Sequence, residues 1–136
     1  MSDQVAFFDT NVLLYLLSAD HSKADRAEEV LAAGGVASVQ VLNEFVSVAS
    51  RKLAMQWSEI KDCLDSFRRT LRVEPLTIET HDQALYVAER YNLSFYDALI
   101  ISAAKLSGCA VLYSEDLQHG QVFDKSLIVR NPFKVG

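Results

Sequence analysis

The chain has 136 residues, of which 50% are hydrophobic and 23% charged, so it can form one soluble domain with a substantial core. Its 13 Lys and Arg are outnumbered by 18 Asp and Glu, and the net charge of -5 excludes a broad basic surface that binds nucleic acid without regard to sequence. Cys63 and Cys109 lie far apart without metal-ligand spacing, which predicts core thiols in a reducing compartment.

The N-terminus is acidic where a signal peptide would be basic, and no apolar stretch approaches the roughly 20 residues that span a bilayer. We therefore expect a single domain over residues 1–136, located in the cytoplasm and not attached to a membrane.

The first half of the chain alternates short apolar runs with helical patterns. Residues 5–8 predict a buried strand, and the residues that follow it are helix-capping types: Asp9, Thr10 and Asn11. Helical periodicity then predicts helices over residues 22–33, 38–53 and 58–71, with a short strand at 36–37 after the first of them. Two consecutive helices thus separate the second strand from the third.

The second half continues the alternation. Residues 73–76 predict a strand in which Pro75 marks an edge or an end, and a helix follows from Thr77 or Thr80 to Tyr91. Residues 94–107 predict a helix that is apolar almost all round and therefore buried. The remaining expected elements are a strand at 110–113, a polar loop at 114–121 and a fifth strand at 127–129.

These strands lack hairpin signals and the period-two alternation of a half-exposed sheet. The pattern predicts an α/β fold of three layers, α/β/α, around a central parallel sheet of four to five strands in a doubly wound, Rossmann-like arrangement.

Acidic residues follow two of the predicted strands, at the sheet edge where such folds bind ligands. Asp9 ends the first strand, while Glu115 and Asp116 follow the fourth. Each has an ordinary structural explanation as well, because Asp9 is a good helix N-cap and the 114–116 segment can be a solvated loop.

Two further acids lie on predicted helices. Asp97 falls beside Ile100 and Ala104 on an apolar helix, where it either forms a capping box with Ser94 or needs a cation. Glu44 lies opposite the apolar stripe of its helix, which suits a surface residue paired with Arg51. In a doubly wound fold, however, the helix starts after strands one, two and four come close together, and clustered carboxylates then require a divalent cation such as Mg²⁺ or Mn²⁺.

Four segments together resemble the acidic motifs of the PIN-domain ribonucleases, in particular the VapC-type toxins of toxin-antitoxin modules. They are residues 7–13 (FFDTNVL), 43–45 (NEF), 95–100 (FYDALI) and 114–116 (SED). Because the four follow one another in the order and spacing of that family, the resemblance extends over essentially the whole chain. The resemblance implies a PIN-like fold, a catalytic and metal-binding quartet, and a set of supporting residues. The quartet is Asp9, Glu44, Asp97 and Asp116, and the supporting residues are Thr10, Asn11, Ser114 and Glu115.

The fourth motif departs from the family pattern, because Leu117-Gln118-His119-Gly120 stand where an aromatic residue usually follows the final Asp. Both Asp116 and Glu115 therefore remain candidates for the fourth acidic ligand.

By the same resemblance, the chain is expected to be a metal-dependent endoribonuclease that uses Mg²⁺ or Mn²⁺ and acts as a toxin. The implied partners are RNA, a small antitoxin that binds the acidic site, and a second copy of the chain in a homodimer.

Two alternative functions stay open. One is a catalytically silent PIN-like protein that binds RNA or serves as a scaffold. The other is a receiver-type signalling domain, which would need an Asp at the end of the third strand, where the sequence has Val73-Glu74-Pro75-Leu76.

Overall fold

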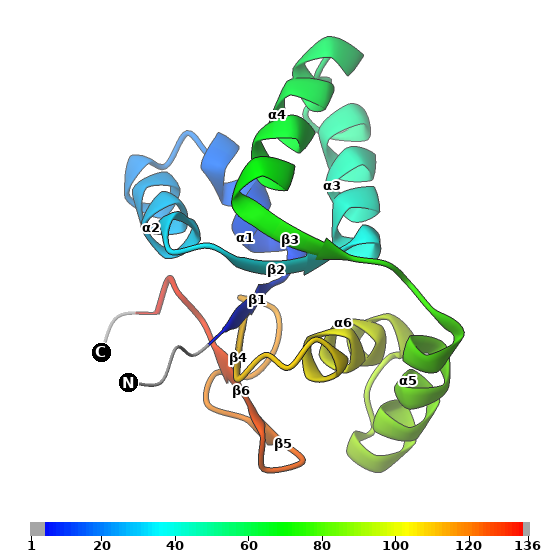
Figure 1. The fold of residues 1–136 in the computed structure, drawn as a ribbon. Helices are drawn as coiled ribbons and strands as arrows, with labels where there is room; N and C mark the ends of the chain where they lie inside the picture. Colours follow the sequence, from blue (N-terminus) through cyan, green and yellow to red (C-terminus); the bar gives the residue numbers. More distant parts are fainter. Residues whose placement is uncertain (1–4, 135–136) are drawn as a thin grey trace.

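The computed structural model describes residues 5–134, which fold into three layers around one twisted sheet (Figure 1). Its strands within this range are β1 (Ala6–Phe8), β2 (Gly35–Ser38), β3 (Leu71–Glu74), β4 (Val111–Tyr113), β5 (Val122–Phe123) and β6 (Leu127–Arg130). They are arranged in the order β3-β2-β1-β4-β6-β5, and all neighbouring pairs are parallel except β5 with β6. The order runs outward in both directions from β1, which confirms the doubly wound α/β prediction.

Helices cover both faces of this sheet. They are α1 (Thr10–Leu14), the 3₁₀ helix η1 (Tyr15–Leu17), α2 (His21–Ala32), α3 (Val39–Arg51), α4 (Trp57–Thr70), α5 (Ile78–Tyr91) and α6 (Phe95–Leu106). Helices α1 to α4 lie on one side of the sheet, and α5 and α6 lie on the other (Figure 1). This is the predicted three-layer arrangement.

The core forms where the apolar strands meet the buried helix faces. Phe7 and Leu112 on the central strands are fully buried, as are Phe45 on α3 and Ile101 on α6. Each such side chain contributes about 1.5–3 kcal/mol when it leaves water. The seven consecutive residues 98–104 of α6 are all buried, as its apolar composition predicts.

Gly35 allows β2 to approach β1 closely. Its φ of +150° is a conformation that L side chains rarely adopt, and a Cβ atom there would lie 2.5 Å from the carbonyl oxygen of Ala6. Gly35 therefore lets the second strand pack against the first, while Gly34, with a φ of 79°, follows the end of α2.

Several predicted boundaries are confirmed, while others move by a few residues. Helix α2 begins at His21 rather than Ser22, because the Asp20 carboxylate accepts hydrogen bonds from the first backbone N–H groups of the helix. Strand β3 spans Leu71–Glu74 rather than 73–76, since residues 71–74 pair in register with β2. Helix α4 accordingly begins and ends slightly earlier than its apolar periodicity predicts.

The sheet of the described residues has six strands rather than the predicted four to five, and one pair of them forms a hairpin for which the sequence shows no signal. Strands β5 and β6 pair antiparallel, with Phe123 opposite Leu127, and the turn between them contains Asp124 and Lys125 at φ values of 49° and 61°. Left-handed residues of this kind suit a tight hairpin, but Gly and Asn are the usual signals for them. A two-residue strand followed by an atypical turn left no pattern in the sequence.

The structure also bears on the predictions made for the two cysteines and for membrane-spanning segments. Both Cys63 and Cys109 are free, and burial raises the pKa of the Cys109 thiol to about 11, as expected of an unreactive core thiol. None of the helices between residues 5 and 134 is long and apolar enough to cross a membrane.

Candidate functional site

The candidate site lies at the edge of the sheet where β1, β2 and β4 end. Phe8 pairs with Tyr113, so the residues that follow them, Asp9 and Ser114, lie side by side. Helix α3 starts at this edge after β2, and the start of α6 lies beside it, because Gln40 in the first turn of α3 is within 3.4 Å of the Tyr96 carbonyl oxygen in the first turn of α6. The topology thus gathers the four motifs; we call Asp9, Glu44, Asp97 and Asp116 the acidic edge.

Asp9 is the most buried of these acids, with 8% of its surface exposed. One carboxylate oxygen accepts the backbone N–H of Thr10 at 2.7 Å, and the other accepts the Ser114 hydroxyl at 2.8 Å. The pKa of Asp9 is nevertheless raised to about 6: burial is the main cause, the negative charges of Asp116 and Glu44 add to it, and the two hydrogen bonds oppose it. Asp9 is therefore both the N-cap of α1 and a carboxylate in an unfavourable electrostatic position.

Glu44 is joined to the same edge by its hydrogen bonds. The Thr10 hydroxyl donates to Glu44 Oε1 at 2.7 Å, so the residue next to Asp9 orients the acid on α3. Gln40 is buried and lies one helical turn before Glu44. Its side-chain nitrogen Nε2 is 3.5 Å from Glu44 Oε2 and 3.4 Å from the carbonyl oxygen of Tyr96 on α6. Glu44 thus faces the site rather than forming the surface pair with Arg51 that its helix position alone suggests.

Asp116 approaches Asp9 from the loop after β4. Asn11 Nδ2 donates to Asp116 Oδ2 at 3.1 Å, and the Asp116 backbone N–H donates to the Ser114 hydroxyl oxygen at 3.2 Å. Ser114 is fully buried and also donates to Asp9, so one hydroxyl orients both acids.

Asp97 reaches this edge through helix α6. It lies in the first turn of α6, one residue after the Tyr96 carbonyl that faces Gln40. Ser94 caps the helix by accepting the Asp97 backbone N–H at 3.2 Å, which is half of a capping box. Across the described residues, the Asp97 carboxylate takes no hydrogen bond and no ion pair, so the other half of the capping box is not formed and the carboxylate is free to bind a ligand.

The acidic edge has no cationic partner. Between residues 5 and 134, none of its four acids forms a salt bridge, although five other ion pairs are present in that range. All the oxygens it presents are hard donors of the kind that Mg²⁺ and Mn²⁺ prefer, so the donor set fits such a cation in kind. Within the same range, no three acidic, histidine or cysteine side chains are close enough to hold a metal ion together. The charges of Glu44 and Asp116 act on Asp9, but the acids of the described residues do not form a closed ligand shell.

The sequence matches the family model of the PIN domain over residues 6–123. The chain belongs to the PIN domain family. No protein of curated function matches it.

Solved structures with the same fold include toxins of toxin-antitoxin systems. A chain of a toxin-antitoxin complex from Klebsiella pneumoniae has a TM-score of 0.72 and 20% identity, with 96% of this chain and 99% of that one covered. VapC20 of Mycobacterium tuberculosis, described as a sarcin-ricin loop cleaving toxin, has a TM-score of 0.67 and 22% identity, covering 82% and 89%. VapBC2 from Rickettsia felis, solved with a DNA fragment from its promoter, has a TM-score of 0.66 and 20% identity, covering 93% and 98%. At these identities the likeness establishes the fold.

In this PIN domain, the two acids of the fourth motif point to different surroundings. Asp116 faces Asn11 and acts on the pKa of Asp9, whereas the Glu115 carboxylate is bound by Tyr15 and Lys23. This geometry favours Asp116 as the acid that belongs with Asp9.

Three polar residues next to the acids were not predicted to take part: Gln40, Tyr15 and Lys23. A signal existed for Gln40 only, because it stands four residues before Glu44 on the same face of a helix. Tyr15 and Lys23 meet Glu115 across about a hundred residues of chain, and no local pattern marks such a contact.

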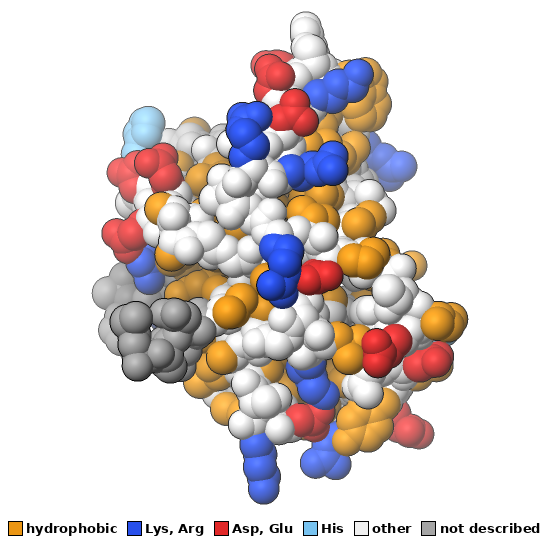
Figure 2. Space-filling model, viewed as in Figure 1, with side chains coloured by type: hydrophobic (Ala, Val, Ile, Leu, Met, Phe, Trp, Pro, Cys, Tyr) orange, Lys and Arg blue, Asp and Glu red, His pale blue; other side chains and the backbone are white. Residues whose placement is uncertain are grey.

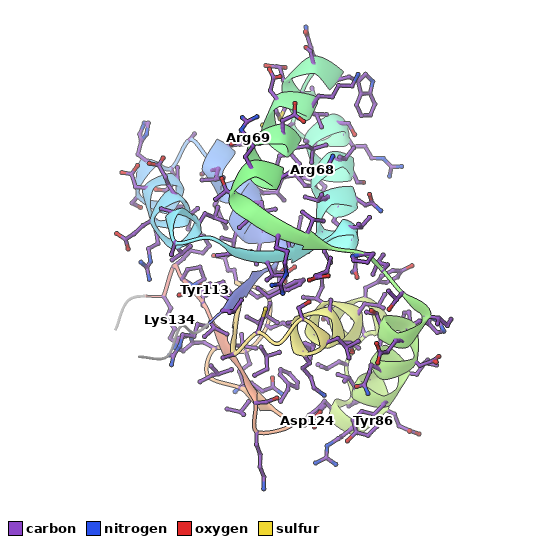
Figure 3. All side chains as sticks on the ribbon, viewed as in Figure 1. Arg68, Arg69, Tyr86, Tyr113, Asp124 and Lys134 are labelled. Carbon is purple, nitrogen blue, oxygen red and sulfur yellow. The ribbon has the colours of Figure 1, made fainter. Side chains whose placement is uncertain are left out.

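Lys and Arg side chains of α4 lie apart from the acidic edge, and two of them line a separate groove. Arg68 and Arg69 lie toward the C-terminal end of α4 (Figure 3). Arg68 and Lys61 line an open groove of about 560 Å³ between α3, α4 and β3, together with Asn43, the neighbour of Glu44. On the face drawn in Figure 2, Lys and Arg side chains are interspersed with acidic and hydrophobic ones. This mixture agrees with the low basic content of the sequence.

Proposed function

We propose that this PIN domain is a metal-dependent endoribonuclease that hydrolyses RNA phosphodiester bonds and acts as the toxin of a toxin-antitoxin pair. One observation carries the proposal: a buried Asp9, with a pKa raised to about 6, lies within the field of Glu44 and Asp116 and forms no salt bridge with any residue between 5 and 134. A site of this kind is unfavourable for the protein alone and becomes favourable when a divalent cation binds. The fold is that of the toxins described above.

In this proposal, the acidic edge holds Mg²⁺ or Mn²⁺ through Asp9, Asp97, Asp116 and Glu44. When bound, the cation supplies Lewis acidity toward a phosphodiester and the water that attacks it. The chain's own contribution is orientation. Ser114 fixes one Asp9 oxygen by donating a hydrogen bond, Thr10 fixes Glu44, and Asn11 fixes Asp116. In this mechanism no side chain has to act as a nucleophile.

The proposed protein partners follow from the solved relatives. The Klebsiella pneumoniae structure is a toxin-antitoxin complex, so we infer a small antitoxin that covers the acidic edge of this chain. An Arg side chain suits that role, because its planar fork matches a pair of carboxylates. A homodimer formed through helices rich in Leu and Val, in the cytoplasm where RNA and reducing conditions coexist, completes the proposal. Light scattering of the purified chain, alone and with the product of the neighbouring reading frame, tests both associations.

The rival function is a catalytically silent PIN-like RNA-binding or scaffold protein. The charges of Glu44 and Asp116 beside the buried Asp9 support the nuclease, since a silent protein gains nothing from the repulsion between these three acids. The deciding experiment incubates total cellular RNA with the wild-type protein and with Asp97→Asn in Mn²⁺, and maps new RNA ends. New ends from the wild type alone support the nuclease. RNA binding without cleavage by either protein favours the rival.

A further inference from the structure

Glu115 lies beside the acidic edge, but its carboxylate is bound by residues outside that edge. The Tyr15 hydroxyl donates to Glu115 Oε1 at 2.6 Å, and Lys23 Nζ donates to Oε2 at 3.2 Å. Lys23 Nζ also lies 3.1 Å from the Tyr15 hydroxyl oxygen, so the three groups form a closed triangle. We call Tyr15, Lys23 and Glu115 the Glu115 cluster. Glu115 differs from the acids of the acidic edge because its charge is paired with the Lys23 ammonium at 3.2 Å, so a cation would have to compete with Lys23 for it.

The Glu115 cluster is anchored on three segments of the fold. The Lys23 ammonium lies 4.5 Å from the centre of the Tyr15 ring and 5.7 Å from that of Phe133, and these two rings pack 4.5 Å apart. Tyr15 comes from η1, Lys23 from α2 and Phe133 from the segment after β6. Cation–π contacts and a charged hydrogen bond in a half-buried setting make this a firm attachment for the loop that carries Glu115.

The attachment fixes the direction of the next residue. The Asn11 side chain contacts both residues of this loop. Its Oδ1 accepts the Glu115 backbone N–H at 3.2 Å, and its Nδ2 donates to Asp116 Oδ2 at 3.1 Å. Consecutive side chains of the loop therefore point in opposite directions. Glu115 points toward Tyr15, and Asp116 points back toward Asn11, where its charge reaches Asp9.

We propose that Glu115 is a positioning residue, and that the Glu115 cluster sets the cation affinity of the acidic edge by holding Asp116 toward Asp9. The inference rests on the proposed function, because it assigns a role toward the cation that the acidic edge is proposed to bind. It assigns Asp116 as the ligand and Glu115 as the anchor, with Tyr15 and Lys23 acting through Glu115.

Tyr15→Phe gives the sharpest test, because it removes one donor from Glu115 without changing any charge. The chain supplies a matched control in Tyr91, whose hydroxyl donates to Asp124 at 2.7 Å in a second Tyr–carboxylate–Lys group that includes Lys105. Tyr91→Phe removes the same kind of bond at the β5–β6 hairpin, together with the bond that the Tyr91 hydroxyl accepts from the Asp124 backbone N–H. Mn²⁺ binding is measured by calorimetry on RNA-free protein, so the readout does not depend on catalysis.

Tyr15→Phe is expected to weaken Mn²⁺ binding by about 10-fold, the lower end of the range for losing a residue that orients a ligand. Tyr91→Phe should bind Mn²⁺ like the wild type. Glu115→Gln should weaken binding too, and the double variant with Tyr15→Phe should bind no more weakly than Glu115→Gln alone, because both changes break one cluster. Unchanged or tighter binding by Tyr15→Phe overturns the proposal, since freeing a Glu115 oxygen would help if Glu115 were a ligand.

Backbone hydrogen exchange at residues 115–117 gives a readout that does not require a metal. Faster exchange there in Tyr15→Phe, and not in Tyr91→Phe, is expected if the Glu115 cluster holds the loop. Faster exchange with wild-type Mn²⁺ affinity shows a purely structural role and overturns the inference. If the wild type binds no Mn²⁺ at all, the proposed function fails, while the exchange data still show whether the cluster positions Asp116.

Discussion

Asp9 and Asp124 are both aspartates at the end of a strand, and their surroundings shift the pKa in opposite directions. Asp124 lies at the β5–β6 hairpin (Figure 3), where it accepts a hydrogen bond from Tyr91 and pairs with Lys105 and Arg90. The hydrogen bonds from Lys105 and Tyr91 lower its pKa. Asp9 ends β1, where burial and two negative neighbours raise its pKa to about 6.

The difference separates a carboxylate that stabilises the fold from one that is available to a ligand. The charge of Asp124 is neutralised by side chains of the chain itself, so nothing further needs to bind there. Among the described residues, the Asp9 carboxylate accepts hydrogen bonds only from a backbone N–H and a hydroxyl, which carry no charge. The negative charges of Glu44 and Asp116 repel it. The same residue type thus predicts function at one site and stability at the other, and variants of each can break or sharpen the comparison.

The largest expected effect is on RNA cleavage. Asp97→Asn should reduce it by more than about 100-fold, the upper limit for residues that merely orient a metal ligand. The fold should survive, because the Ser94 hydroxyl and the backbone of residue 97 make the helix cap. Asp124→Asn, the matched change at the hairpin, should cleave RNA like the wild type. Cleavage of total RNA in Mn²⁺ measures both variants, and normal activity in Asp97→Asn would show that Asp97 is only part of a cap.

Removal of the divalent cation gives the second effect. EDTA should abolish cleavage, and Mg²⁺ at about 100 times its Kd should raise the free energy of unfolding by ~2.7 kcal/mol because only the folded state binds it. Asp97→Asn should gain much less from Mg²⁺, whereas Asp124→Asn should gain as much as the wild type. Thermal melting in EDTA and in excess Mg²⁺ checks this. An equal gain in all three proteins would place cation binding outside the acidic edge.

The pH dependence of stability gives a third effect, in which the two aspartates should differ in sign. Because the folded-state pKa of Asp9 lies near 6 and its ordinary value is 3.8, the folded protein binds more protons than the unfolded chain between these values. Asp9 therefore lowers stability as pH rises through this window, by at most roughly 3 kcal/mol at neutral pH. Urea unfolding in EDTA from pH 4 to pH 7 should show that Asp9→Asn removes this loss.

The slope with pH is the quantity to compare, not the stability at one pH. The amide that Asp9→Asn introduces has a single acceptor oxygen and cannot accept from Thr10 and Ser114 as the carboxylate does, so the variant also loses about 1 kcal/mol at every pH. Identical slopes in the wild type and Asp9→Asn would mean that Asp9 ionises normally in the folded protein.

The sequence was enough to predict most of the fold because its signals are local. Short apolar runs marked the central strands, and Asp9, Ser38, Thr77 and Ser94 were identified at helix starts, where the structure has them as N-caps. The gathering of Asp9 and Asp116 could also be predicted, because the doubly wound topology brings the ends of β1 and β4 together.

Two features could not be predicted, and both depend on contacts distant in sequence or on unusual local geometry. The β5–β6 hairpin uses Asp124 and Lys125 in left-handed conformations that those residues seldom adopt. The choice between Glu115 and Asp116 depends on Tyr15, which lies 100 positions before Glu115. Neither leaves a periodicity or a capping pattern in the sequence.

The smallest expected effect concerns Asp124 itself. Asp124→Asn should lower the free energy of unfolding at neutral pH by about 1–2 kcal/mol, the usual contribution of a partly exposed carboxylate that accepts charged and neutral hydrogen bonds. Asn tolerates the left-handed backbone at this position, so the change tests the charge and not the turn.

Because the folded-state pKa of Asp124 is lowered, the stability that its carboxylate contributes is present above the unfolded pKa and is lost as pH falls through the folded value. The variant should therefore differ from the wild type at pH 7 and converge with it in acid, which is the reverse of Asp9→Asn. Urea unfolding at pH 7 and at pH values below 3.8, the ordinary pKa of an Asp carboxyl, measures this directly. A difference that persists unchanged at low pH would attribute the stability to hydrogen bonds that Asn also lacks, and the two aspartates would then no longer form an opposed pair.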